Sequence, residues 1–196
     1  MAANAPLDLV RKLLGELAQR IVVRRPQRIY VDVPPEHTLR ANRLVFEQLG
    51  GRLATASGVD QRDRIEVLYH YCLDAHGVIV TLRTWALKPD LRLDSVAQFL
   101  PAAAWAEREM QDLLGVVFVD HPDPRRLILA DEWPEGVFPL RRDFPARKGT
   151  ASPPSPLSMC GGGAGGEAAA AEPGPRPPEG KPAAAGQPPA LRSPTQ

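Results

Sequence analysis

Apolar residues in the first part of the chain repeat at two spacings, one typical of helices and one typical of strands. In LDLVRKLLGEL the large apolar side chains fall on one helical face, which predicts a packing helix: Val10, Leu13, Leu14 and Leu17. RIEVLYHYCL (64–73) instead alternates apolar with mostly polar residues, as a strand with one buried face does. The chain therefore mixes helices and strands from its start.

The same two spacings predict the remaining elements and their order. Strands are expected at 29–33, 52–57 and 78–85, and helices are expected after Pro34-Pro35 and after Pro101. Gly50-Gly51 and Gly115 end these two helices, and residues 74–77 form a turn between strands. Together they predict an α+β domain, in which an antiparallel sheet carries helices on one face.

The composition changes twice toward the C-terminus. Residues 118–146 are expected to form an extended C-terminal segment, and within it EWPEGVFPLRRDFP (132–145) contains too many prolines for regular structure. From about Thr150 the chain is rich in Pro, Gly and Ala, which predicts a disordered tail over 150–196. The expected organisation is one domain over 1–149 followed by this tail.

Charge and cysteine content exclude several classes of protein. The formal net charge of +1 gives no basic excess, so nucleic acid is not an expected partner. The two cysteines, Cys72 and Cys160, are too few for an iron-sulfur cluster held by this chain alone. The start of the chain has no signal-peptide pattern, and its longest strongly apolar run is LLGVVFV. We expect an intracellular protein that does not span the membrane.

A cluster of charged residues, AEREMQDLLGV, lies at the end of the last predicted helix. On a regular helix one face carries Trp105, Arg108, Glu109 and Asp112, whereas Glu107 points elsewhere. A metal site is disfavoured because no histidine accompanies these acids at a ligand spacing. Two interpretations stay open: a solvated face with an Arg108–Asp112 ion pair, or a semi-buried network that fixes the helix end against the following loop.

Other candidate residues favour structural roles. His121 precedes Pro122 in a turn, where a structural role is commoner than a catalytic one. Arg125 and Arg126 are either solvated or paired with Glu109 or Asp112. The three tryptophans are expected in the core or in contacts: Trp85, Trp105 and Trp133.

The stretch EREMQDLLGVVFVDHPDPRRLIL resembles the signature of the 30 kDa subunit of respiratory complex I, an NADH:quinone oxidoreductase. The resemblance falls on Glu107, Arg108, Glu109, Asp112, Leu113, Gly115, His121, Pro122, Asp123, Arg126, Leu127 and Ile128. PLRRDFP (139–145) is similar to a second element of that family. Leu114 stands where an aromatic residue is frequent, and WPEGVFPLR looks closer to the related subunits of energy-converting, membrane-bound nickel-iron hydrogenases.

The resemblance implies a non-catalytic subunit of the peripheral arm of such a complex. Its partners would be the large (49 kDa, hydrogenase-like) subunit and the small iron-sulfur subunit, with the membrane arm in indirect contact. It would dock and stabilise the large subunit during electron transfer coupled to ion translocation, as a peripheral protein on the cytoplasmic side of the cell membrane. It would bind no cofactor itself, while partner subunits carry iron-sulfur clusters and FMN or a nickel-iron centre.

By this resemblance, fourteen residues are expected in structural or interface roles: Glu107, Arg108, Glu109, Asp112, Gly115, His121, Pro122, Asp123, Arg126, Trp133, Phe138, Arg141, Asp143 and Phe144. Glu109, Arg108 and Asp112 would fix the helix end and the HPDPRR loop. Apolar residues of 130–145, such as Val137, would contact the partner. The alternative from another class is a stand-alone enzyme that uses Glu109 or Asp112 with His121 as acid and base.

Overall fold

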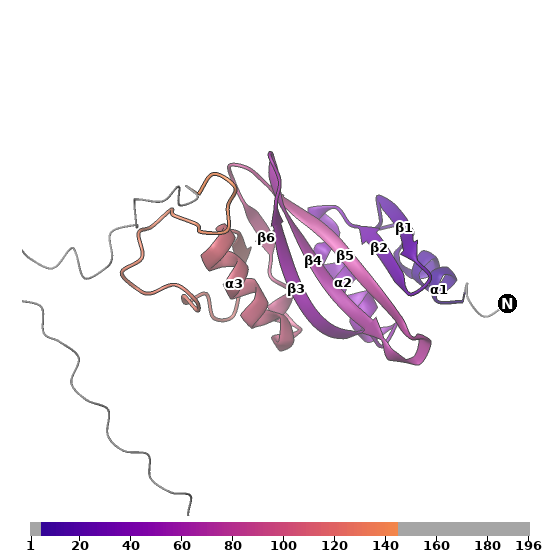
Figure 1. Cartoon of the computed structure of the whole chain (residues 1–196). Helices are drawn as coiled ribbons and strands as arrows, with labels where there is room; N and C mark the ends of the chain where they lie inside the picture. The colour runs from indigo at the N-terminus through magenta and orange to yellow at the C-terminus, as the bar shows by residue number, and fades with distance from the viewer. Residues whose placement is uncertain (1–4, 145–196) are drawn as a thin grey trace, which may run out of the picture. The chain divides into compact units, whose positions relative to one another are not determined.

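The computed structural model describes residues 5–144 (Figure 1). In chain order, the helices and strands are α1 (Ala5–Leu14), β1 (Arg20–Arg25), β2 (Arg28–Asp32), α2 (Thr38–Glu47), β3 (Arg52–Asp60), β4 (Arg64–Leu73), β5 (Val78–Leu87), β6 (Arg92–Asp94), α3 (Ala104–Leu114) and β7 (Val117–Val119). Short 3-10 turns precede α2 and α3 and connect β4 to β5. The tail predicted from about Thr150 lies outside the described residues.

The α+β class predicted from the sequence is confirmed, with two differences in the sheet: strand β1 was not predicted, and one pair of strands is parallel. Five strands lie in the order β1-β2-β5-β4-β3. Three of the neighbouring pairs are antiparallel as predicted, but β2 and β5 are parallel. The chain passes from β2 through α2 and the β3–β4 hairpin before it returns as β5, and this longer connection brings β5 back in the direction of β2.

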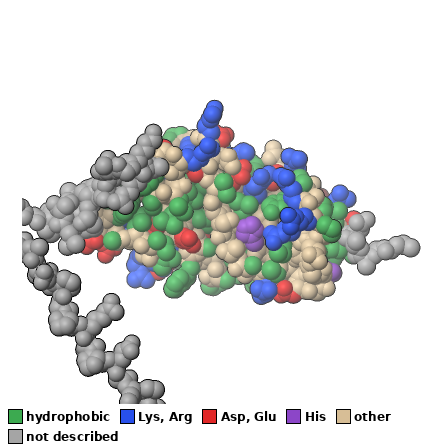
Figure 2. Space-filling view, in the orientation of Figure 1, with side chains coloured by type: hydrophobic (Ala, Val, Ile, Leu, Met, Phe, Trp, Pro, Cys, Tyr) green, Lys and Arg blue, Asp and Glu red, His purple; other side chains and the backbone are tan. Residues whose placement is uncertain are grey.

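The two faces of this sheet have different environments. Alternate residues of β4 are buried on the face that the helices cover: Ile65, Val67, Tyr69, Tyr71 and Leu73. The Tyr71 hydroxyl donates to Asn42 on α2, and the Tyr69 hydroxyl donates to Glu107 on α3. Both helices therefore pack on one face, as the sequence predicted. No helix of residues 5–144 covers the opposite face, which we call the open face, and basic side chains gather there beside a histidine (Figure 2).

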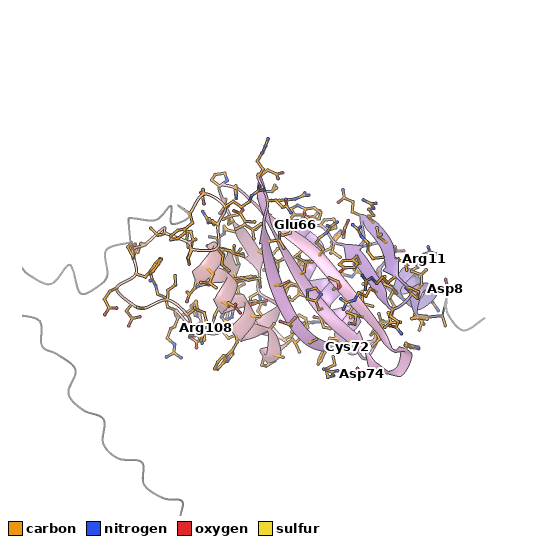
Figure 3. All side chains as sticks on the ribbon, viewed as in Figure 1. Asp8, Arg11, Glu66, Cys72, Asp74 and Arg108 are labelled. Atoms are coloured by element: carbon orange, nitrogen blue, oxygen red, sulfur yellow. The ribbon has the colours of Figure 1, made fainter. Side chains whose placement is uncertain are left out.

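A small second sheet fixes both ends of α3. Strand β6 enters the α3 region, β7 leaves it, and the two pair in parallel. Gly115 ends α3 in the left-handed conformation, with φ of +73°, as the sequence predicted for the end of this helix. Figure 3 shows Arg108 on α3 at one end of the domain and Arg11 on α1 at the other. Within residues 5–144, no helix is both long and apolar enough to cross a membrane.

Candidate functional site

The site begins with the face of α3 that turns toward the sheet. The residues of this face are buried and recur at spacings of four and three: Ala103, Glu107, Met110 and Leu114. Glu107 is the only charged member, and its exposed fraction is 0%. A carboxyl group at this depth is costly unless donors surround it.

Three donors reach the Glu107 carboxyl group. Its Oε1 accepts from the Tyr69 hydroxyl and from the backbone N–H of Val96, both within 2.9 Å. Its Oε2 accepts from the Ser95 hydroxyl at 2.5 Å. Ser95 also accepts from the N–H of Ala97, where it caps a 3-10 turn. One side chain of α3 thus joins strand β4 to the segment that leads into the helix.

Burial and hydrogen bonding act on the Glu107 carboxyl in opposite directions. Burial raises the pKa of Glu107 above its ordinary value, while the hydrogen bonds from Ser95, Tyr69 and Val96 lower it. Burial and the nearby Glu107 charge also raise the pKa of the Tyr69 hydroxyl well above its ordinary value. Tyr69 therefore acts as a neutral donor.

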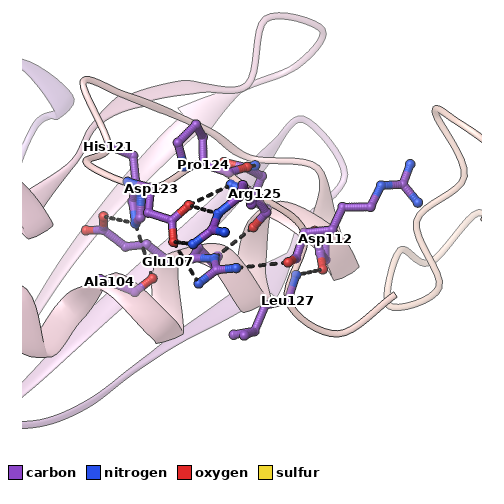
Figure 4. A network of polar contacts seen from close by, with 11 residues as sticks. Ala104, Glu107, Asp112, His121, Asp123, Pro124, Arg125 and Leu127 are labelled. Carbon is purple, nitrogen blue, oxygen red and sulfur yellow. Dashed lines mark hydrogen bonds and ion pairs between the residues drawn. The ribbon is translucent and has the colours of Figure 1, made fainter. Parts of the chain in front are cut away.

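His121 closes the same buried cluster from the loop after β7 (Figure 4). Its Nδ1 accepts from the N–H of Asp123 at 3.0 Å, and its Nε2 donates to the carbonyl of Ala104 at 3.2 Å. Because one ring nitrogen accepts and the other donates, these bonds fit the neutral imidazole protonated on Nε2. Nε2 also lies 3.8 Å from Glu107 Oε2. These contacts join the loop after β7 to the start of α3.

Arg108 holds the loop that follows His121. Its guanidinium donates to the carbonyls of Arg125 and Arg126 at 2.7 and 2.9 Å and lies 3.3 Å from Asp123. Asp123 also accepts two bonds from Arg125, and these bonds are the main cause that lowers the pKa of Asp123. Arg108 therefore binds the main chain rather than Asp112.

Asp112 holds the main chain of residues 127–129, which follow those that Arg108 holds. Its Oδ2 accepts from the N–H groups of Leu127 and Ile128 at 2.8 Å and from that of Leu129 at 3.3 Å. Gln111 donates to the carbonyl of Pro124 at 2.7 Å. We call Arg108, Gln111 and Asp112 the α3 clamp, because all three hold the main chain of 124–129 against the helix.

Residues 130–144 contain no helix or strand and are held by further side-chain contacts. Arg126 donates to the carbonyls of Ala130 and Trp133, and the Trp133 indole donates to the carbonyl of Val137. Arg141 donates to the carbonyl of Leu114 and lies over the Phe138 ring at 4.1 Å.

The end of this segment returns to the sheet. The N–H of Arg142 donates to Asp60 on β3 at 2.8 Å. Asp143 is exposed and Phe144 is half-buried. Pro122, which follows His121 in the loop after β7, is exposed.

A known protein family matches most of the chain. Residues 31–150 match the model of the respiratory-chain NADH dehydrogenase 30 kDa subunit. The chain belongs to this family. The match runs from the end of β2 through α2, β3, β4 and β5 to α3 with its clamp, and it includes the whole segment that the clamp holds.

Relatives of this 30 kDa subunit family member come from more than one kind of complex. A subunit of the NADH-quinone oxidoreductase of Chloroherpeton thalassium is 42% identical over 94 residues, which are 47% of this chain and 38% of that protein. Formate hydrogenlyase subunit 5 of Escherichia coli is 35% identical over 105 residues, which are 50% of this chain and 18% of that protein. The matched part thus spans well under half of either relative.

A solved structure shares the fold. A chain of the membrane-bound sulfane sulfur reductase, an archaeal respiratory membrane complex, superposes with a TM-score of 0.62 at 26% sequence identity. The alignment covers 71% of this chain and 85% of that chain.

Two expectations about α3 need correction. Glu109 was expected in the network, but it is exposed and forms no hydrogen bond or ion pair with the residues in 5–144. The acid that occupies the inward face is Glu107, two residues earlier and therefore about 200° away around the helix. The buried stripe of Ala103, Met110 and Leu114 marks that face in the sequence.

The expected ion pairs are also replaced by other contacts. Arg108 and Asp112 do not pair with each other, because each satisfies main-chain groups of the following loop. Arg125 pairs with Asp123 rather than with Glu109 or Asp112. Sequence analysis missed Tyr69 and Ser95 as partners of Glu107, since neither belongs to the motif.

The geometry leaves little room for acid-base chemistry in this motif. The side chains of Glu107 and His121 are 0% exposed, and Asp112 already accepts three N–H groups. Glu109 points to solvent, away from these groups. Between residues 5 and 144, no group of three or more His, Cys, Asp or Glu side chains is placed to hold a metal ion.

Proposed function

We propose that this chain is a non-catalytic subunit of a membrane-bound, energy-converting oxidoreductase complex, in which it docks and stabilises the large, hydrogenase-like subunit. The observation that carries the proposal is the α3 clamp. It fixes a segment without regular structure against a helix, and large apolar side chains remain exposed nearby: Trp105 (70%), Ile128 (54%) and Leu140 (60%).

This arrangement suits docking for two physical reasons. Irregular segments lose much conformational freedom on binding, and a segment already held at its main chain loses less. Exposed tryptophan and aliphatic side chains on such a surface are typical of binding hot spots. The buried Glu107 cluster adds rigidity, because it ties α3 to β4.

The relatives support the setting of this role. Their names place them in NADH-quinone oxidoreductase and formate hydrogenlyase, and the structural neighbour is part of a respiratory membrane complex. We extend the proposal accordingly: the partners are the large subunit and a small iron-sulfur subunit, with the membrane arm in indirect contact. Iron-sulfur clusters, with FMN or a nickel-iron centre, belong to the partners, and this chain lies peripherally on the cytoplasmic side.

Affinity purification from membranes tests the proposal. The tagged chain should recover a large subunit related to the hydrogenase catalytic subunit. The double variant Trp105→Ala/Ile128→Ala should recover at least tenfold less of it, because both side chains belong to the proposed contact surface.

Two controls separate docking from general damage. Phe46→Ala removes a partly exposed aromatic side chain on α2, and deletion of 151–196 removes the Pro/Gly/Ala-rich tail. Both should keep the wild-type recovery. Recovery of the wild-type chain as a lone monomer from intact membranes would overturn the proposal, and so would an equal loss from Phe46→Ala.

A further inference from the structure

The open face of the five-stranded sheet carries a basic hollow of about 440 Å³, far from α3. It is lined by Val22, Arg24, Arg25, Arg28, Tyr30, Leu68 and Arg83. These residues come from β1, β2, β4 and β5. Basic side chains gather at this end of the open face (Figure 2).

The arginines of the hollow differ in how they are paired. Arg83 makes two hydrogen bonds to Asp32, at 2.8 and 2.7 Å, and lies 3.7 Å from Glu66. Arg24, Arg25 and Arg28 are exposed, and within residues 5–144 no carboxylate lies within 4.0 Å of their charged groups. Three uncompensated charges thus concentrate on one face, although the whole chain carries only +1.

The positive charge of these arginines also affects a histidine on strand β4. His70 points to the same open face of β4 and contacts Ser57 and Thr81. Burial lowers the pKa of His70 and the positive charge of Arg28 lowers it further. The positive potential over the open face is therefore felt by a side chain beside the hollow.

The floor of the hollow is apolar and restricts the ligand class. Val22, Tyr30 and Leu68 are half-buried between the arginines. Guanidinium groups pair bidentately with carboxylates, and the apolar floor accepts an aliphatic or aromatic side chain. A single tyrosine is a poor stacking platform for nucleotide bases, so a polypeptide fits better than a nucleic acid.

We propose that this hollow binds an acidic segment of a partner polypeptide, which presents an apolar side chain flanked by carboxylates. The tail of this chain is a poor occupant, because its three acids (Glu167, Glu172, Glu179) are balanced by three bases over 150–196. The inference rests on the proposed function only in placing the partner in the same complex. The surface itself is separate from the α3 clamp.

Photo-crosslinking in the assembled complex tests the inference. Tyr30→p-benzoylphenylalanine places the crosslinker on the floor of the hollow with little change of shape. Irradiation should yield one main crosslinked peptide from another subunit, and its sequence by mass spectrometry should be acidic. Adding Arg25→Glu/Arg28→Glu should reduce this crosslink at least tenfold, since like charges then face each other.

A matched charge reversal on the helical side gives the control. Arg11→Glu/Arg40→Glu changes the net charge by the same amount through exposed residues of α1 and α2, and the crosslink should persist. Thermal unfolding of each variant checks that the fold is intact.

The outcomes separate this inference from the proposed function. A crosslink to a neutral or basic segment, to residues 145–196 of this chain, to nucleic acid or to lipid would overturn the inference, as would an unchanged or absent crosslink within a complete complex. Failure of the chain to co-purify with a large subunit would instead count against the proposed function.

Discussion

The local structure depends most on Glu107, whose carboxyl group is buried. Isolated burial of a carboxylate is strongly unfavourable, but here three donors from β4 and from the segment before α3 offset the cost. The same donors would be left without a partner if the carboxyl were removed. Glu107 therefore contributes chiefly by satisfying groups that the fold has already buried.

Replacement of Glu107 should lower the free energy of unfolding in proportion to the number of buried polar groups that lose their hydrogen-bond partner. Glu107→Ala should lower the free energy of unfolding by about 3–5 kcal/mol, because it leaves two hydroxyls and one N–H buried without an acceptor. Glu107→Gln should cost roughly 1–2 kcal/mol, since the amide keeps one acceptor oxygen. Urea unfolding measures both, and equal losses would argue against the hydrogen-bonded network.

The raised pKa of Glu107 has a definite consequence for stability against pH. A carboxyl whose folded pKa lies above its unfolded value, about 4.3, stabilises the fold most below that value. This contribution is lost as the pH rises through the folded pKa. The stability of the wild type relative to Glu107→Gln should therefore fall between about pH 4 and the raised pKa, as denaturant titrations at several pH values will measure. A relative stability that rises over this interval would contradict the burial argument.

At the scale of elements, α3 works as a two-sided scaffold. Its inward face packs on the sheet, and its outer side carries the α3 clamp for residues 124–129. Gly115 ends the helix, and a Cβ at this position would lie 2.5 Å from the Phe138 ring and 2.6 Å from the Arg141 guanidinium. The helix end and the distal segment can thus meet only over a glycine.

Substitution of Gly115 should therefore lower the free energy of unfolding by more than the left-handed backbone conformation alone would. Gly115→Ala should lower the free energy of unfolding by about 3 kcal/mol, from left-handed strain plus the clash with Phe138 and Arg141. Gly77→Ala has nearly the same φ, +60°, but open space around the new Cβ, and should cost only about 1 kcal/mol. Equal decreases in the free energy of unfolding for the two variants would show that the close packing around Gly115 contributes nothing to stability.

The α3 clamp can be opened with little damage to the core. Asp112→Ala should speed amide hydrogen exchange at Leu127, Ile128 and Leu129 by about tenfold or more, because each N–H loses its acceptor. Glu109→Ala removes an exposed acid from the same helix and should leave these rates unchanged. Comparable acceleration by both variants would restore Glu109 to the network.

At the scale of the whole molecule, the domain presents two separate surfaces. Apolar side chains lie exposed around α3 and its bound segment, and arginines that have no carboxylate partner within residues 5–144 lie on the open face of the sheet. Acidic and basic residues nearly balance over the chain, so these surfaces arise from placement rather than from composition.

The proposed subunit role makes a simple prediction for the purified protein. The isolated chain should contain no stoichiometric iron, nickel or flavin and should reduce no electron acceptor, because Glu107, Asp112 and His121 are engaged in structural bonds. Metal analysis, absorption spectra and activity assays measure this. A stoichiometric metal ion, or turnover abolished by Asp112→Asn, would support a stand-alone enzyme instead.

The sequence by itself determined the classes of element and several of their ends. Periodicity located the three helices and strands β2 to β5 but missed β1 and β6, Gly115 marked the end of α3, and the spacing of Arg108 and Asp112 indicated a network with the following loop. These features depend on neighbours within a few residues, which a linear pattern records.

Only the tertiary structure decided which side of α3 faces the sheet and where β5 pairs. Both depend on contacts between residues far apart in the chain, such as Tyr69 with Glu107 and β2 with β5. A helical pattern that contains charged residues on more than one face fits two rotations about its axis. Packing selects the rotation that satisfies the buried groups of other elements, and in this protein it selected Glu107 over Glu109.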